Sequence, residues 1–259
     1  MSRALAVALL AALFVATPAA ADPPRSGVVH VPRSGSLLEQ GYQLYGGNCV
    51  SCHGSRGAGV LSKTEGAGNQ TGLGPRLQGV GAQAADFYLR TGYMPLEHVS
   101  SQPARSRVLF SDREIRALVA YVASLGPGPA IPTPHPDRGK LNEGLSLFSE
   151  HCAGCHQING EGGYVTGARV PPLNDATPVQ IAEAVRIGPY LMPRFPKSQI
   201  TDAQLDSIIA YVLHTRHPTD PGGWGIGHVG PVPEGIVAWL VAAVALVAVC
   251  LAIGKRLEE

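Results

Sequence analysis

The stretches Cys49-Val50-Ser51-Cys52-His53 and Cys152-Ala153-Gly154-Cys155-His156 decide the fold of this chain of 259 residues. In each stretch two cysteines are separated by two residues and followed at once by a histidine. The flanking sequence repeats as well, because Gly41-Tyr42-Gln43-Leu44-Tyr45 and Gly144-Leu145-Ser146-Leu147-Phe148 precede their motifs at the same distance. We therefore expect two similar domains, each built around its own cysteine motif.

Helices are predicted before each motif and at the end of each half. The preceding helix carries a glycine that lets another helix cross closely, and its aromatic residue packs one turn later at the crossing. The closing helices begin with the capping-box spacings Ser111 to Glu114 and Thr201 to Gln204. Their apolar residues recur at helical spacing: Ile115, Leu118, Val119 and Val122 in the first, and Leu205, Ile208, Ile209 and Val212 in the second.

Composition sets the broad organisation. The 32 glycines and 22 prolines favour short helices joined by long loops, and a formal net charge of +1 gives no reason to expect nucleic-acid binding. We expect seven segments in chain order: a signal peptide over 1–21, domain 1 over 33–126, a Pro-rich linker over 127–138, domain 2 over 139–216, a Gly/Pro tether over 217–234, a transmembrane helix over 235–254 and a tail over 255–259.

The two ends of the chain predict export and anchoring. Arg3, the short apolar run that follows it and Ala19-Ala20-Ala21 form a secretory signal pattern, for which cleavage is favoured over retention as an anchor. The uncharged run over 235–254 is long enough to cross a bilayer as a helix. Lys255 and Arg256 follow it, and the positive-inside rule places them in the cytoplasm. The chain is thus expected in the cell membrane as a single-pass protein with both domains on the outer side.

A Cys-x-x-Cys-His motif attaches c-type haem covalently. The two sulfurs, at Cys49 and Cys52 and again at Cys152 and Cys155, bond the porphyrin edge, and the histidine that follows supplies the proximal nitrogen to iron. A redox dithiol or half of a zinc site uses the same cysteine spacing. Neither explains two motifs, each followed by histidine in the same repeat, so we predict two covalently bound haem c groups.

The sixth ligand to each iron is predicted by elimination. The chain has three methionines, of which Met1 belongs to the signal segment. Met94 and Met192 each precede a proline at matching places of the repeat, and they lie 41 and 36 residues after His53 and His156. We therefore expect His/Met ligation in both domains, which raises the reduction potential and leaves no position for oxygen. His98, four residues after Met94, is the alternative ligand in domain 1.

Prolines follow each cysteine motif, and two explanations of their position are open. Pro75, and either Pro171 or Pro172, can place a backbone carbonyl against the proximal histidine and so fix its orientation. Simple stiffening of the loop explains the same prolines equally well.

Several strings resemble the diheme cytochrome c subunit of the actinobacterial-type cytochrome bc1 complex. They are Gly74-Pro75-Arg76-Leu77-Gln78-Gly79-Val80-Gly81, Thr91-Gly92-Tyr93-Met94-Pro95-Leu96, Ala120 to Pro129, and Gly222-Gly223-Trp224-Gly225 with Gly230-Pro231-Val232-Pro233-Glu234-Gly235. The last string lies outside any haem motif. The resemblance implies a mostly α fold, with two tandem class I cytochrome c domains plus a C-terminal transmembrane helix.

The resemblance also implies a role in respiration. Partner subunits with b-type haem (cytochrome b) and a Rieske iron–sulfur centre would oxidise a quinol, and the Rieske centre would reduce the haem at Cys49, Cys52 and His53. The second haem would pass electrons to a haem-copper terminal oxidase in a supercomplex. The chain would be the electron-transfer subunit of a quinol–cytochrome c reductase, a translocase, and would not be catalytic alone.

Three alternatives use similar domains. A membrane-anchored diheme cytochrome c could serve another dehydrogenase or oxidase, and would purify without cytochrome b and Rieske subunits. A diheme peroxidase needs an open haem position, against which Met94 and Met192 argue. A cytochrome c domain of the oxidase itself should carry copper ligands or further membrane spans, and the sequence has neither.

Overall fold

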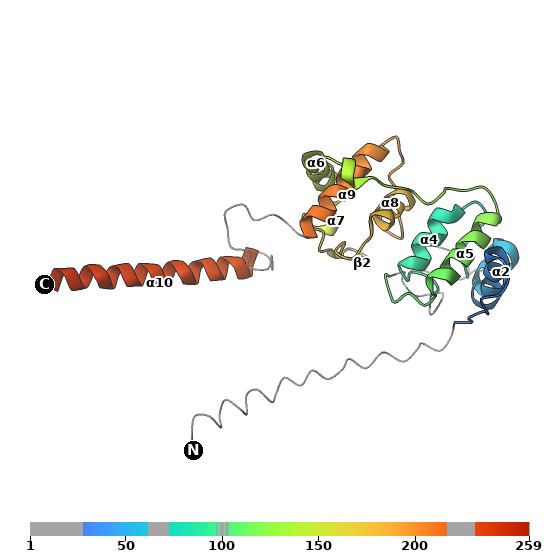
Figure 1. The fold of residues 1–259 in the computed structure, drawn as a ribbon, viewed down its shortest axis with the longest axis horizontal. Helices are drawn as coiled ribbons and strands as arrows, with labels where there is room; N and C mark the ends of the chain where they lie inside the picture. The colour runs from blue at the N-terminus through green and yellow to red at the C-terminus, as the bar shows by residue number, and fades with distance from the viewer. Residues whose placement is uncertain are drawn as a thin grey trace, which may run out of the picture. The chain divides into compact units, whose positions relative to one another are not determined.

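The computed structural model describes residues 28–61, 73–96, 98, 101, 104–216 and 231–258. The predicted signal peptide and residues 217–230 of the predicted tether lie outside these ranges. The chain divides into two compact units, Met1–Val212 and Leu213–Glu259, and the first contains both cysteine motifs. The prediction of a mostly α fold with a C-terminal apolar helix is confirmed, as Figure 1 shows.

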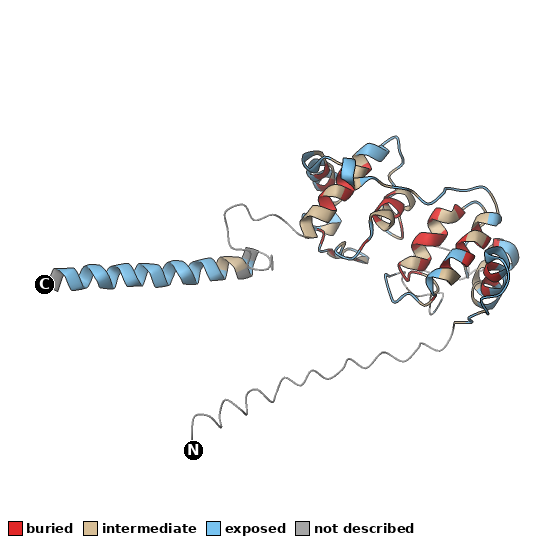
Figure 2. Ribbon diagram, in the orientation of Figure 1, coloured by how far each residue is buried: buried red, intermediate tan, exposed pale blue. Residues whose placement is uncertain are grey.

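The first domain is a small set of helices around a shared core. In chain order these are α2 (Leu37–Asn48), α3 (Val50–His53), the 3-10 turn η1 (Ser55–Gly57), α4 (Gly81–Arg90) and α5 (Asp112–Ser124). Helix α5 packs against both α2 and α4 (Figure 1). Their inward faces carry much of the buried core, which includes Leu44 of α2 and Leu118 of α5, and the same faces are red in Figure 2.

The second domain repeats this order of helices. It comprises η2 (Pro136–Arg138), α6 (Leu141–His151), α7 (Ala153–His156), β1 (Gly163–Val165), β2 (Ala168–Val170), α8 (Pro178–Ile187) and α9 (Asp202–Arg216). The two short strands form an antiparallel hairpin in which Gly163 pairs with Val170. The hairpin was not predicted. In the first domain the corresponding loop has one isolated bridge, between Val60 and Gly74.

A glycine marks the helix crossing in each domain. A side chain at Gly41 of α2 would overlap the carbonyl of Ala117 in α5, and one at Gly144 of α6 would overlap the carbonyl of Ser207 in α9. The aromatic residue one turn later, Tyr45 or Phe148, is buried. The predicted close crossing is therefore present twice, and no larger residue fits at either glycine.

The closing helices are capped as the sequence indicates. In α5 the backbone N–H of Ser111 donates to the carboxylate of Glu114 at 2.9 Å. In α9 the backbone N–H of Thr201 donates to Oε1 of Gln204 at 2.9 Å, and the Gln204 N–H donates back to Oγ1 of Thr201 at 3.3 Å. These bonds satisfy N–H groups that a helix end leaves without partners.

The second unit contains α10 (Pro231–Glu258), whose stretch Glu234–Arg256 is long and apolar enough to cross a membrane. Every residue from Ile236 to Arg256 is exposed, as the pale blue helix of Figure 2 shows. A long apolar helix with an exposed surface is unfavourable in water and suits a lipid environment.

Candidate haem sites

Both cysteine motifs have the same backbone structure. Cys49 ends α2 through a 2.9 Å hydrogen bond from its N–H to the carbonyl of Tyr45, and Cys152 ends α6 through the equivalent 2.8 Å bond to Phe148. A single helical turn then follows, in which the second cysteine lies three residues after the first. Because residues three apart share one side of a helix, the two sulfurs of each motif lie on the same side. Each turn ends at its histidine.

His53 is oriented as a proximal ligand requires. Its Nδ1 lies 2.8 Å from the carbonyl oxygen of Pro75, which can only accept, so Nδ1 carries the proton and Nε2 has its lone pair free. Burial lowers the pKa of His53, and the bond to Pro75 opposes this in part. A neutral imidazole with a free Nε2 is the form that binds iron. The predicted contact with Pro75 is thus present, and the site fits a haem ligand.

His156 in the second domain lacks this orienting bond. Burial lowers its pKa, and the nearby carbonyl of Pro171 opposes the change in part. That carbonyl is close enough to act electrostatically, but the geometry of a hydrogen bond is not met. The buried Nδ1 of His156 has no partner among the described residues. The carbonyl of Pro171 therefore lies near His156 as predicted, but it forms no hydrogen bond with the Nδ1 atom.

The cysteine environment argues against the two alternative uses of the motif. Burial, with a smaller effect from the second thiol, raises the pKa of the Cys49 thiol to about 12 and that of Cys152 to about 11. A redox dithiol needs the opposite shift, because the thiolate is the reactive form. Zinc needs four ligands. Within the described ranges, no three His, Cys, Asp or Glu side chains are grouped to hold a metal ion.

The two candidate methionines are half-buried, and their loops are held by backbone hydrogen bonds. Met94 packs against the core cluster of the first domain, which Cys49 also contacts, and its N–H donates to the carbonyl of Tyr88 at 3.0 Å. The N–H of Met192 donates to Pro189 at 3.0 Å. His98, the alternative ligand, is exposed. Axial ligation by both methionines stays a prediction.

An arginine at the end of α4 and of α8 anchors each methionine loop, a role that the sequence did not reveal. Arg90 donates to Asp86 at 2.8 and 3.0 Å, and to Asp112 at the start of α5 at 2.8 Å. Arg186 donates to Asp202, the matching residue at the start of α9, at 2.8 Å. The bonds tie the segment that carries each methionine to the closing helix of its domain.

Arg186 makes further bonds within its own loop. Its Nη1 donates to the carbonyl oxygens of Phe195 and Ile200, at 3.0 and 2.7 Å. Hydrogen bonds from Lys197 and Arg186 hold the pKa of Asp202 below its usual range. The charged form of Asp202, which accepts from Arg186, is therefore favoured.

A tyrosine hydroxyl ties the loop after each motif to a helix, again outside the predicted residues. In the first domain Tyr45 of α2 donates to the carbonyl of Gly54 at 2.7 Å and accepts from the N–H of Gly57 at 3.1 Å. In the second domain Tyr211 of α9 donates to the carbonyl of Ile158 at 2.7 Å. The repeat pairs Tyr45 with Phe148, so sequence comparison alone shows no common donor.

Comparison with known families defines the class of these domains. Residues 38–126 match the model of the cytochrome c family, and residues 139–212 match that of cytochrome C oxidase, cbb3-type, subunit III. The two helical domains with their Cys-x-x-Cys-His turns are therefore cytochrome c domains, a class that implies covalently bound haem c.

Comparison over the whole chain is more specific. The cytochrome bc1 complex cytochrome c subunit of Mycobacterium tuberculosis H37Rv is 37% identical over 262 residues, covering 96% of this chain and 90% of the relative. The subunits of that name from Mycobacterium leprae (36%, 86% of this chain and 77% of the relative) and Corynebacterium diphtheriae (33%, 85% and 82%) are also similar. The chain belongs to the family of cytochrome bc1 complex cytochrome c subunits, and its role is electron transfer. Among solved structures, a chain of the Kuenenia stuttgartiensis reducing HAO-like protein complex aligns at 14% identity over 72% of this chain and 99% of that one, with a TM-score of 0.35, which carries no structural argument.

Proposed function

We propose that this chain holds two haem c groups and relays electrons from a Rieske centre to a haem-copper terminal oxidase, as the fixed carrier of a quinol-oxidising bc1 complex. The observation that supports this most is the duplication of one domain structure. Each of the two domains has a Cys-x-x-Cys-His turn, a buried histidine of lowered pKa and an arginine-anchored methionine loop. Two such domains in one chain suit two electron carriers in series.

The ligand residues follow from this duplication. Cys49 and Cys52 would bond the first haem, and Cys152 and Cys155 the second. His53 with Met94, and His156 with Met192, would coordinate the two irons. When bound, each haem supplies a centre that gains and loses one electron.

The surrounding residues have separate tasks in this proposal. The Pro75 carbonyl holds the tautomer and ring orientation of His53. The arginine anchors keep each methionine in place, which fills the sixth position and excludes oxygen chemistry. Tyr45 and Tyr211 hold the loops beside the cysteine turns. Together these contacts limit movement of the ligands, so that little reorganisation accompanies electron transfer.

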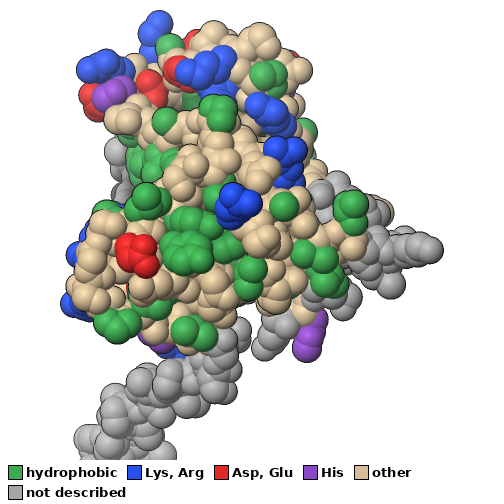
Figure 3. All heavy atoms as spheres, turned by 90° about the vertical axis from the view of Figure 1, so that its right-hand side faces the viewer, with side chains coloured by type: hydrophobic (Ala, Val, Ile, Leu, Met, Phe, Trp, Pro, Cys, Tyr) green, Lys and Arg blue, Asp and Glu red, His purple; other side chains and the backbone are tan. Residues whose placement is uncertain are grey.

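The surface of the first domain suits brief contacts with redox partners. Exposed apolar residues lie on α2 and between the first two cysteines: Leu37, Leu38, Tyr42 and Val50. Figure 3 shows one face of the molecule, where hydrophobic side chains are interspersed with Lys and Arg. Mixed surfaces without one large apolar patch are typical of transient complexes. We propose that the haem at Cys49, Cys52 and His53 faces the Rieske centre.

Helix α10 would hold the carrier at the membrane. With Lys255 and Arg256 in the cytoplasm, the two cytochrome c domains lie on the extracytoplasmic side. A tethered carrier replaces diffusional encounter by a fixed effective concentration near its donor and acceptor. The chain would thereby combine the tasks of a membrane-bound cytochrome and a mobile one.

Purification tests the assembly. Tagged chain should bring down subunits with b-type haem and a Rieske centre together with a terminal oxidase, and deleting the chain should abolish electron flow from quinol to oxygen. Recovery of the chain without b-type haem, with quinol oxidation intact in its absence, would overturn the proposal. Covalent haem is measured on the same samples, because replacing Cys49 and Cys52 by serine should halve it, and so should replacing Cys152 and Cys155.

A second candidate is a cytochrome c that serves an oxidase without a bc1 complex. The match of residues 139–212 to an oxidase subunit family favours it. In that case the tagged chain would recover the oxidase but neither cytochrome b nor a Rieske subunit.

A further inference from the structure

Helices α4 and α8, one from each cytochrome c domain, pack against each other within the first unit. Glu183 lies on α8 and is completely buried, with an exposed fraction of 0%. Neither of its carboxylate oxygens has a hydrogen-bond partner among the described residues. A buried, unpartnered carboxylate is costly when charged, so this residue requires an explanation beyond packing.

The charged groups that act on Glu183 come from the facing helix. Burial raises the pKa of Glu183, the like charge of Asp86 adds to the rise, and Arg90 opposes both, so that the resulting pKa is about 8. Asp86 is itself only 4% exposed and receives the Nε of Arg90 at 2.8 and 3.0 Å. Arg90 also donates to Asp112. Its bonds are thus directed to two other carboxylates, and Glu183 obtains no direct cationic partner.

The fold does not require a carboxylate at this position. Alignment of the repeats on Arg90 and Arg186 pairs Glu183 with Phe87, which is buried and packs against other aromatic rings. An apolar residue therefore satisfies the same place in the first domain. The polar residue at this place in the second domain, Glu183, is explained by the contact between the two domains.

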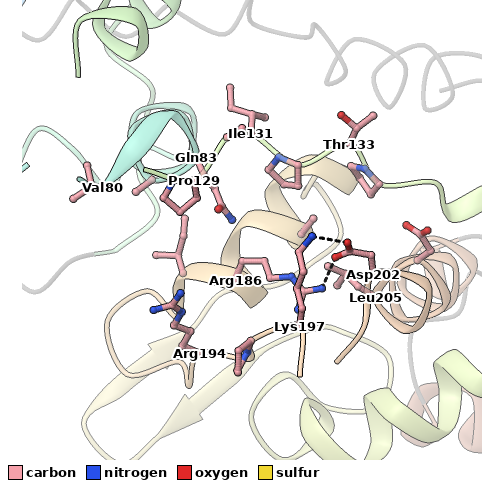
Figure 4. A pocket seen from close by; sticks show the side chains of 18 of the residues that line it. Val80, Gln83, Pro129, Ile131, Thr133, Arg186, Arg194, Lys197, Asp202 and Leu205 are labelled. Atoms are coloured by element: carbon pink, nitrogen blue, oxygen red, sulfur yellow. Dashed lines mark hydrogen bonds and ion pairs between the residues drawn. The ribbon is translucent and has the colours of Figure 1, made fainter. Parts of the chain in front are cut away.

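Solvent reaches the edge of this contact through a groove of about 930 Å³. Gln83 of α4, Ala182 and Arg186 of α8, and the Pro-rich linker contribute to its lining (Figure 4). Ala182 directly precedes Glu183. Gln83 lies one turn before Asp86, and its buried Nε2 also lacks a hydrogen-bond partner in the described ranges. The groove brings solvent to the sequence neighbours of Glu183 and Asp86, and neither carboxyl group lines it.

We propose that Glu183 is a proton-binding site in the contact between the two cytochrome c domains, and that release of its proton loosens the packing of α4 on α8. The neutral form removes the repulsion from Asp86 and the cost of a buried charge. The ionised form restores both in a place that offers no hydrogen bond. The distance between the two domains would then depend on pH.

The direction of the pH dependence follows from linkage. A carboxyl group whose pKa is higher in the docked state than in the separated state binds its proton more tightly when docked. Docking is therefore fully favoured at low pH and weakens by about tenfold per pH unit as pH rises above the ordinary glutamate value. The weakening ends near pH 8, where the docked form also loses its proton.

Infrared difference spectra of the full-length protein in detergent test the protonation directly. The carboxylic acid C=O band of the wild type should disappear with a midpoint near pH 8. Between about pH 6 and 9, where carboxyl groups of ordinary pKa are ionised, the band should be absent in Glu183→Gln, a permanently neutral analogue of similar size. Glu161→Gln, the same change at an exposed position of the second domain, should keep the band. Absence of the band from the wild type at about pH 6, or a band in Glu183→Gln that still titrates near pH 8, overturns the proposal.

Hydrogen exchange tests the loosening. At alkaline pH the amides of α4 and α8 should exchange faster in the wild type than in Glu183→Gln at the same pH, while those of α5 stay equal. Asp86→Asn removes the like charge and should move the infrared midpoint to lower pH. Equal exchange in wild type and Glu183→Gln across the pH range contradicts the loosening, and an unmoved midpoint in Asp86→Asn contradicts the pairing of the two carboxyls.

Discussion

The two cytochrome c domains share a scaffold but hold their ligand residues differently. Both have a glycine at the helix crossing and a capped closing helix. In the first domain His53 is bonded to Pro75, and Tyr45 makes two bonds to the loop after the motif. In the second domain the Nδ1 of His156 has no hydrogen-bond partner within the described part of the chain, and the arginine network is the richer one. In the first domain the hydrogen bonds thus fix mainly the proximal histidine and the loop after its motif, and in the second domain they fix mainly the methionine loop.

This difference shows which parts of the repeat are constrained by the fold. The crossing glycines and caps recur because any deviation disrupts helix packing. The hydrogen bonds around the predicted ligand residues differ, because contacts that orient a ligand residue tune a site without being needed to form it. Two domains with distinct surroundings can have distinct reduction potentials, which a directional relay requires.

The largest expected effect comes from the helix crossing that both domains share. Gly41→Ala places a methyl group against the Ala117 carbonyl and should destabilise the first domain by about 3 kcal/mol or more, because backbone must move. Gly144→Ala should do the same in the second domain. Gly46→Ala on the same helix is the control, since nothing lies within 4 Å of the added methyl group. Thermal unfolding of the purified variants measures the effect.

A fall in stability for Gly46→Ala as large as for Gly41→Ala would refute the crossing as the cause. Alanine is otherwise favoured over glycine inside a helix, so the control should be neutral or slightly more stable.

A smaller effect is expected from the arginine anchors, where the domains differ. Arg186→Lys leaves two backbone carbonyls without their donor and should weaken the Met192 loop by about 2 to 3 kcal/mol, since bonds from charged donors are strong. Arg90→Lys should weaken the Met94 loop less, because its partners are carboxylates that a lysine can still approach. Loss of the sulfur–iron absorption band on warming measures both. Arg116→Lys, at an exposed pair with Asp112, is the control. Equal losses in all three variants would show that the anchors do not hold the loops.

The tyrosine contacts give the smallest of the three effects. Tyr45→Phe removes the partner of two backbone groups and should cost about 2 kcal/mol, whereas Tyr211→Phe removes one and should cost about 1 kcal/mol. Tyr121→Phe in the same aromatic cluster, whose ring packs on Tyr45, is the matched control, since no hydrogen bond of its hydroxyl is seen among the residues that the structure describes. Denaturant unfolding ranks the three variants. A ranking in which Tyr211→Phe is the most damaging would contradict the proposed division between the domains.

Local sequence patterns predicted the shared features of the two domains well. The crossing glycines and the caps, which both domains share, depend on residues that neighbour one another or on a single close approach, as does the Pro75 contact of the first domain alone. The role of Arg186 was harder to predict, since its carbonyl partners are 9 and 14 residues away along an irregular loop. The three-residue strands of the hairpin are too short to show a period of two. Glu183 looks in the sequence like a residue on the polar side of a helix, and nothing in the local pattern indicates that it is buried.

The most direct test of the central claim is the optical spectrum of the oxidised protein with each methionine removed. If each domain holds its own haem with His/Met ligation, Met94→Ala and Met192→Ala should each lose about half of the sulfur–iron charge-transfer absorption, and the double variant should lose all of it. Both single variants should retain two covalent haems. An unchanged band in either variant, or a band that persists in the double variant, would contradict the account of two matched haem sites.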